Sequence, residues 1–187
     1  MKLALLLAAA AATGSARAEA AAGGRAADLR CRIALAYVEN LLSEPRWRRS
    51  VFSTEGVVPF IPDRYPEHWG SIDGLSPTPP PPPGLAEALP IGSNAVRGCA
   101  SVRGLLTRRG VRFGNRVVAW ARHLRRGYYR ARVVTISLPA VSADGAHAVL
   151  VAGNGRGGLD GGETWVHMER GRDGRWRATG ATALWVA

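Results

Sequence analysis

The residue types that build common metal and catalytic motifs are scarce in this chain of 187 residues. It has two cysteines and four histidines, which form neither a C-x-x-C pair nor an H-x-x-x-H spacing. No serine lies within a G-x-S-x-G sequence. These absences exclude zinc motifs of the finger and zincin types and the nucleophile elbow of α/β-hydrolases. Motifs alone therefore assign no catalytic residue, no metal ligand and no cofactor.

Long hydrophobic runs are absent beyond the N-terminus. The one such run, residues 3–12, follows Lys2 and precedes a small-x-small sequence at residues 16–18. This order is typical of a secretory signal peptide, and the run is too short for a permanent membrane anchor. We therefore predict that residues 1–18 are removed. The mature protein is then periplasmic or secreted and is not an integral membrane protein.

The remaining length predicts a flexible start at residues 19–27 and a single domain at residues 28–187. Five consecutive prolines fall within residues 76–84. Such a composition favours polyproline II backbone without a packed core of its own. We expect a stiff, exposed loop there.

Cys31 and Cys99 are the two cysteines of the chain. Disulfides form in the oxidising compartments that an exported protein reaches. One disulfide between them is therefore expected, and two separate buried thiols are the alternative.

Acidic residues are missing from a long central stretch. None occurs between Glu87 and Asp144, whereas Arg97–Arg132 contains eleven arginines, and the whole chain carries a formal net charge of +11. Guanidinium groups pair with phosphate and carboxylate through two parallel hydrogen bonds. The stretch therefore predicts an anion-binding surface, with these candidates: Arg122, Arg125, Arg126 and Arg130.

An anionic envelope lipid or an acidic polysaccharide is the expected partner of this surface. Nucleic acid would bind by the same electrostatics, but export removes it as the physiological target. The alternative is a solvated basic face in a protein whose basic residues are almost all arginine.

Two segments have helical patterns. After Asp28, the apolar residues of 29–42 cover a broad arc that includes Cys31, and Pro45 ends the pattern. Residues 115–130 predict a second, basic helix. Its expected inner face is Val117, Trp120, Ala121 and Leu124.

The C-terminal part reads as β-structure. Strand patterns cover residues 133–138, 146–152, 163–169 and 176–187, with short connections between them. The predicted fold is therefore α+β, with the N-terminal amphipathic helix and the basic helix packed on a C-terminal antiparallel β-meander of about four strands.

Residues 153–158 match the dinucleotide fingerprint G-x-G-x-x-G. That fingerprint requires a helix after the glycines, but here the following segment, 163–169, is rich in strand formers. We therefore interpret the glycines as residues with positive φ in a wide hairpin turn. Polar residues among them form a candidate cluster: Asn154, Arg156, Asp160 and Glu163.

His147 and His167 fall on neighbouring expected strands. Together with Asp160 or Glu163 they would suit a metal site or an acid–base pair. Solvent-facing strand histidines are the alternative.

The order of motifs from residue 128 to 187 resembles that of a group of uncharacterised secreted bacterial proteins. The matching order is a Ser-rich turn, a glycine-rich hairpin, an aromatic strand and a terminal Leu-Trp-hydrophobic strand. The residues that carry it are Asp144, Ala148, Val149, Gly158, Leu159, Gly161, Gly162, Trp165, Glu169, Arg170, Gly174, Arg175, Trp176, Leu184, Trp185 and Val186. Members often carry cysteines in the hairpin, where this chain has none. The resemblance implies an exported α+β protein and no known activity.

The sequence thus favours a small exported binding or envelope-associated accessory protein with an arginine-rich surface. A hydrolase-like enzyme that uses the His147, His167 and Glu163 neighbourhood is the alternative function.

Overall fold

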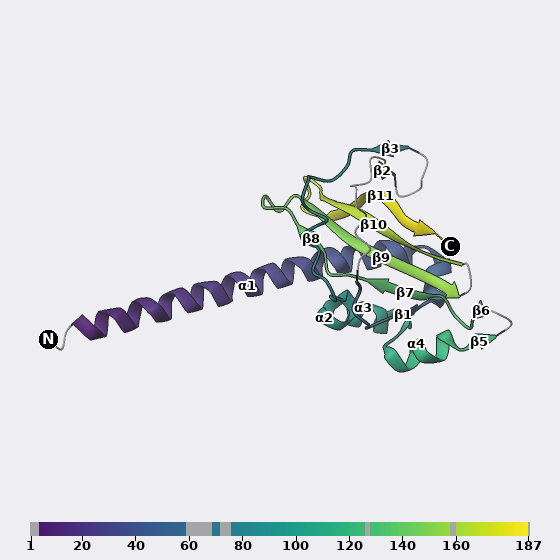
Figure 1. Ribbon diagram of the computed structural model, residues 1–187, viewed down its shortest axis with the longest axis horizontal. Helices are drawn as coiled ribbons and strands as arrows, with labels where there is room; N and C mark the ends of the chain where they lie inside the picture. The colour runs from purple at the N-terminus through teal and green to yellow at the C-terminus, as the bar shows by residue number, and fades with distance from the viewer. Residues whose placement is uncertain (1–3, 59–68, 72–75, 126–127, 158–159, 187) are drawn as a thin grey trace.

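The computed structural model describes residues 4–58, 69–71, 76–125, 128–157 and 160–186 (Figure 1). Helices pack on a mixed sheet of nine strands, so the predicted α+β class is confirmed. Within the described ranges, no helix is both long enough and apolar enough to cross a membrane.

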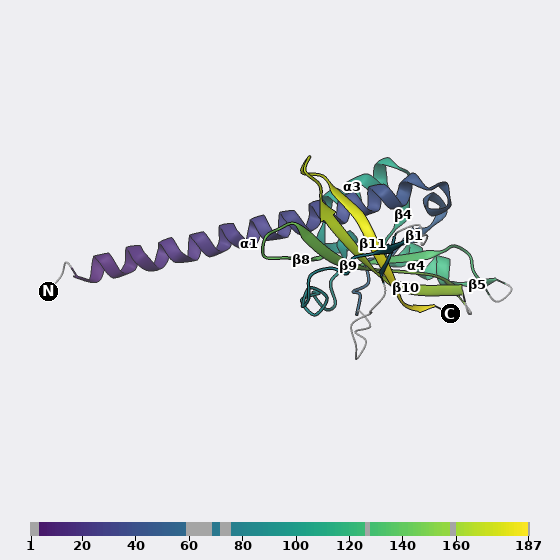
Figure 2. The same cartoon turned by 90° about the horizontal axis from the view of Figure 1, so that it is seen from above.

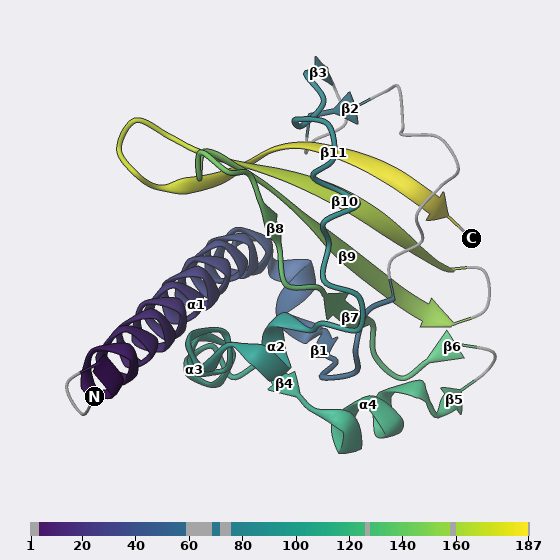
Figure 3. The ribbon, with the colours of Figure 1, turned by 60° about the vertical axis from the view of Figure 1, so that its left-hand side comes forward.

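The sheet has the strand order β3-β2-β11-β10-β9-β7-β1-β4, and β8 pairs with β9 beside this path. The strands of this sheet are β1 (Val51–Phe52), β2 (Trp69–Gly70), β3 (Pro77–Thr78), β4 (Arg112–Phe113), β7 (Val133–Ile136), β8 (Ala140–Val141), β9 (His147–Gly157), β10 (Asp160–Arg170) and β11 (Trp176–Val186). The strands β9, β10 and β11 form a long, twisted antiparallel ribbon (Figure 3).

A meander of about four strands understates this sheet. The extra strands include β1, which pairs in parallel with β7 and with β4. Each of these pairs joins segments that are far apart in the chain, and β1 and β4 have two residues each. Such short strands leave no periodic pattern in the sequence, because alternation needs several residues to show.

The helices are α1 (Ala4–Ser43), η1 (Pro45–Arg49, a 3₁₀ turn), α2 (Ala95–Gly98), α3 (Ala100–Arg108) and α4 (Asn115–Arg122). The expected helix at residues 29–42 is the C-terminal part of α1, and its N-terminal part projects from the sheet (Figure 1). The helix continues through residues 19–27. Removal of residues 1–18 and flexibility of the new terminus stay predictions.

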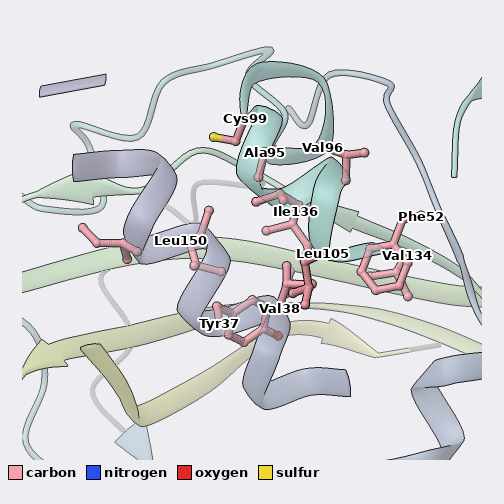
Figure 4. Packing of buried hydrophobic residues seen from close by; sticks show 14 of the residues in the cluster. Tyr37, Val38, Phe52, Ala95, Val96, Cys99, Leu105, Val134, Ile136 and Leu150 are labelled. Carbon is pink, nitrogen blue, oxygen red and sulfur yellow. The ribbon is translucent and has the colours of Figure 1, made fainter. Parts of the chain in front are cut away.

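The main hydrophobic core lies between the helices and one face of the sheet. There α1 and α3 lie side by side (Figure 2), and their buried side chains form one cluster with those of β7, β9 and β10. Val38 of α1 and Leu105 of α3 are buried with Ile136 and Leu150 of the sheet (Figure 4). Cys31 and Cys99 form a disulfide, as predicted, so α1 is covalently joined to the residue that precedes α3.

A second core covers the opposite face of the sheet. Trp165 of β10 and Val149 of β9 are buried there against Trp69 and Leu85. The proline-rich segment is mostly exposed, as expected, although Pro81 is buried and Pro77 and Thr78 form the edge strand β3. An edge strand accepts proline because its outer N–H groups need no partner in the sheet.

The expected basic helix, α4, is shorter than predicted, and it buries a different face. It ends at Arg122, and β5 (Leu124–Arg125) and β6 (Tyr128–Tyr129) follow as a two-stranded antiparallel pair. Its buried residues are Val118 and Ala121, whereas Trp120 is 40% exposed. The predicted inner face was therefore wrong at Trp120. Arginine side chains cover this ring, so an aromatic residue suits the outer side of the helix.

The glycine-rich segment lies mostly within strands, contrary to the prediction of a wide turn. Gly153 and Gly155 belong to β9, and Gly161 and Gly162 to β10. Of the glycines described in this segment, Gly157 alone has a positive φ, +83°. Gly153 is needed for close packing, since a Cβ there would lie 2.5 Å from Oγ1 of Thr135. The next described segment is β10, a strand and not the helix that a dinucleotide site requires.

Candidate functional site

A pocket of about 620 Å³ opens beside the parallel part of the sheet. Most of its wall is arginine, and the lining residues are Arg46, Trp47, Arg48, Arg49, Ser50, Gly110, Arg112, Arg130, Ala131, Arg132 and Arg156. We call this the arginine pocket.

The topology explains why arginines from four segments meet here. The parallel strand β1 lies between β4 and β7, with Val51 paired to both Arg112 and Val133. The N-terminal ends of all three strands therefore lie side by side, and there Arg49, Arg112 and Arg132 line the pocket. The antiparallel β9 brings its far end to these ends, since its Gly155 pairs with Val133.

The positive charge of the pocket is only partly balanced. Arg132 lies 3.7 Å and Arg156 3.9 Å from carboxylate oxygens of Asp160. Arg46 lies 2.7 Å from Glu44. For the remaining arginines of the wall, Arg48, Arg49, Arg112 and Arg130, no carboxylate partner exists among the residues that the structure describes.

Two tryptophans hold several of these guanidinium groups without neutralising them. The guanidinium carbon of Arg112 lies 4.2 Å from the Trp120 ring centroid, and that of Arg130 lies 6.0 Å from it. Arg46 and Arg132 each lie 5.3 Å from the centroid of Trp47. A cation over a ring face keeps its in-plane N–H donors free for a ligand. The pocket therefore offers oriented donors with net positive charge.

Two buried polar groups in the pocket wall have no hydrogen-bond partner in the described part of the chain. They are Nε1 of Trp47 and Oγ of Ser50. The large majority of buried polar groups in proteins have a hydrogen-bond partner. Both atoms have almost no accessible surface, so a ligand in the open pocket would not reach them.

The predicted anion-binding arginines have different outcomes. Arg130 lines the pocket. Arg122 instead pairs with Glu55, at 2.9 Å, and does not line it. Arg125 belongs to β5 by its backbone, and Arg126 lies outside the described residues.

Sequence reasoning missed most of the pocket. Arg46, Arg48 and Arg49 come from the sequence Pro-Arg-Trp-Arg-Arg at residues 45–49, whose three arginines were the available signal. Because these residues are far in sequence from Arg97–Arg132, the sequence did not indicate that the two segments form one pocket.

The polar cluster expected in the glycine-rich hairpin joins this same pocket in part. Nη1 of Arg132 donates a 2.6 Å hydrogen bond to Oδ1 of Asn154, and Asp160 interacts with Arg132 and Arg156 as above. Glu163 pairs with Gly153 further along the ribbon and does not line the pocket.

The two histidines expected to be neighbours are in contact. Nδ1 of His147 lies 3.2 Å from Nε2 of His167, and the rings are stacked. The carboxylate beside them belongs to Glu169, whose Oε1 lies 3.9 Å from the His147 nitrogen and 3.7 Å from the His167 nitrogen. We call these three residues the histidine cluster.

Neither acid that the sequence suggested completes this cluster. Glu163 lies four residues from His167 along β10, about 13 Å at the rise of a strand, and Asp160 faces the arginine pocket. Sequence alternation contained the signal for Glu169, since residues two apart on a strand share a face.

The environment of His167 favours its neutral form. Burial lowers the pKa of His167, the carboxylate of Glu169 opposes that shift, and His147 adds to it. The ring is 2% exposed and meets Trp69 edge-on, with centroids 6.2 Å apart.

Comparison of the chain with protein-family models, with curated proteins and with solved structures found no match.

Proposed function

We propose that this protein binds a phosphate group of an anionic envelope lipid in the arginine pocket. The observation that carries the proposal is the wall of seven arginines, four of them without a carboxylate partner among the described residues. Like charges are gathered at one place only at an electrostatic cost, and a bound anion offsets that cost.

The size of the pocket supports a headgroup as the ligand. A volume of about 620 Å³ lies within the range of small-molecule sites and exceeds the size of a single inorganic phosphate. A concave site also suits one headgroup better than an extended polysaccharide or a DNA duplex, which need a long groove or stripe. A planar guanidinium group can donate two parallel hydrogen bonds to two oxygens of one phosphate.

Export, predicted from the N-terminal segment, supports an envelope target for the same pocket. The hydrolase-like alternative required Glu163 beside His147 and His167. The two histidines are in contact, but the acid beside them is Glu169, so we do not propose hydrolysis. The histidine cluster is treated separately below.

Vesicle binding tests the proposal. Residues 19–187 are purified without an affinity tag and mixed with vesicles of phosphatidylglycerol or lipid A, and with an acidic polysaccharide and a DNA duplex. Binding is measured at low salt and at about 150 mM salt, where surface charges more than ~8 Å apart are largely screened. We expect the phosphate-bearing vesicles to remain bound at the higher salt and the other two ligands to be lost.

Two charge-matched double variants locate the site. R48Q/R112Q removes two pocket arginines, and R25Q/R172Q removes two exposed arginines that do not line the pocket. We expect the first to weaken vesicle binding by about tenfold or more, since charged hydrogen bonds contribute about 1.5–3 kcal/mol each. The second should retain binding within about twofold. Equal losses in both variants, or preference for DNA or polysaccharide, would refute the proposal.

A further inference from the structure

We propose that His147, His167 and Glu169 bind one divalent transition-metal ion of the kind that prefers imidazole ligands, with Zn²⁺ as the representative. This inference does not depend on the arginine pocket. The cluster lies at the start of β9 and the pocket near its end, nine residues and about 30 Å apart along the strand.

The distances between the ligand atoms fit such a site. Zinc bonds to nitrogen and oxygen of about 2.0–2.1 Å in a tetrahedron require ligand atoms about 3.3–3.4 Å from one another. The two nitrogens are 3.2 Å apart, and Oε1 of Glu169 lies 3.9 and 3.7 Å from them. A change of about half an ångström in one carboxylate would complete the triangle.

The ribbon holds the three side chains on one face. His147 is directly paired with Glu169, and His167 is paired with Val149, two residues from His147. Since side chains alternate along a strand, these positions face the same side as Val149 and Trp165, away from α1. Both strands are eleven residues long and paired throughout this region, so the backbone fixes the cluster before any ion arrives.

One side of the cluster is buried and the other reaches solvent. His167 forms the floor at 2% exposure, against Trp69, which itself stacks on Trp165. The side chains of His147 and Glu169 are 32% and 42% exposed. An ion therefore has an entry path, and its fourth position would take water, as in zinc sites with three protein ligands.

A hydrogen bond between the two histidines, without metal, is the competing explanation of the 3.2 Å contact. In that case one ring nitrogen donates and the other accepts. This arrangement gives no reason for metal affinity and no dependence on Glu169. Zinc binding separates the two explanations.

The experiment uses residues 19–187 without an affinity tag, with the disulfide intact and metals removed by a chelator and dialysis. Zn²⁺ affinity and stoichiometry are measured by competition with a chromogenic chelator. Co²⁺ replaces Zn²⁺ for visible spectroscopy, because its d–d bands report the coordination geometry. We expect one Zn²⁺ per chain and the Co²⁺ bands of a four-coordinate site.

Variants assign the ligands. H147A and E169Q change partly exposed side chains and should each weaken Zn²⁺ binding by about a hundredfold, since loss of even an outer partner of a ligand costs about 10–100-fold. H123A changes an exposed histidine outside the cluster and should leave the affinity unchanged. H167N tests the buried ligand, with circular dichroism as the check of folding, and H147A and E169Q decide the question if H167N does not fold.

Two results would overturn the inference. One is a wild-type protein that binds Zn²⁺ no more tightly than the H147A/E169Q double variant. The other is stoichiometric binding that neither single variant changes. The arginine-pocket variant R48Q/R112Q should bind Zn²⁺ like the wild type, so this proposal and the proposed function fail or succeed separately.

Discussion

Cys31 of α1 and Cys99, the residue before α3, are joined by a disulfide across 68 positions of sequence, with their Cα atoms 5.4 Å apart. Cys99 is fully buried in the main core, and Cys31 packs against it. The bond therefore joins α1 to the start of α3, and both helices contribute side chains to the main core.

Removal of the disulfide should destabilise the fold. The chain-entropy model gives about 4 kcal/mol for a loop of this length, and we expect the C31A/C99A variant to lose free energy of unfolding of that order, measured by urea titration. Thiol labelling of the unreduced, denatured protein should find no free thiol, and labelling after reduction should find two. Two labelled thiols without reduction would contradict the bond.

Gly153 should not tolerate a side chain, because of Thr135 on the neighbouring strand. A Cβ at Gly153 would lie 2.5 Å from Oγ1 of Thr135, whereas a Cβ at Gly155 would meet its nearest atom at 3.6 Å. We expect G153A to lower the free energy of unfolding by about 1–3 kcal/mol through overpacking. G155A is the matched control, with a loss of about 1 kcal/mol or less.

The double variant G153A/T135A tests the cause. It removes the hydroxyl that the new methyl group would meet, so much of the stability lost in G153A should return relative to T135A alone. Additive losses in the double variant would show that the contact with Thr135 is not responsible.

Asp160 should weaken anion binding in the arginine pocket, because it faces both Arg132 and Arg156. D160N removes this competing carboxylate, so we expect affinity for phosphatidylglycerol vesicles to rise by about three- to tenfold at low salt, with a steeper dependence on salt. The control is D28N, which removes an equal charge from an exposed ion pair on α1. Weaker binding by D160N would mean that the carboxylate positions the arginines rather than competing with the ligand.

The turn between β10 and β11 should depend on pH through Asp173. Hydrogen bonds from the Arg177 side chain, and then from the backbone of Arg175, lower the pKa of Asp173. A carboxyl group with a folded-state pKa below its unfolded value stabilises the fold above the unfolded pKa, and this contribution is lost as the pH falls through the folded pKa.

We therefore expect D173N to be less stable than the wild type at pH 7, by a modest amount because the pair is exposed. The difference should shrink below about pH 4, where an unfolded aspartate becomes protonated. Urea midpoints at pH 7 and at about pH 3 measure this, and R177Q should show the same pattern. A difference that stays constant with pH would contradict the assignment to charge.

Features governed by local pattern were predicted from the sequence. The helix at residues 29–42 and the strands of the C-terminal ribbon follow from hydrophobic periodicity, which reports the burial of nearby residues. The partner of each cysteine also followed, since two cysteines allow only one pairing, but the structure decided between a bond and two separate thiols by placing their Cα atoms 5.4 Å apart.

Features governed by distant pairing were decided by the tertiary structure. The arginine pocket exists because β1, β4 and β7 run in parallel and begin at one edge, which places Arg49, Arg112 and Arg132 together. Glu169, rather than Glu163, joins His147 and His167 because the register of β9 with β10 pairs it with His147. The sequence determined which residues favour helix, strand or charge, because those preferences are local. Which side chains share a site depended on register and strand order, and these are fixed only when the whole core packs.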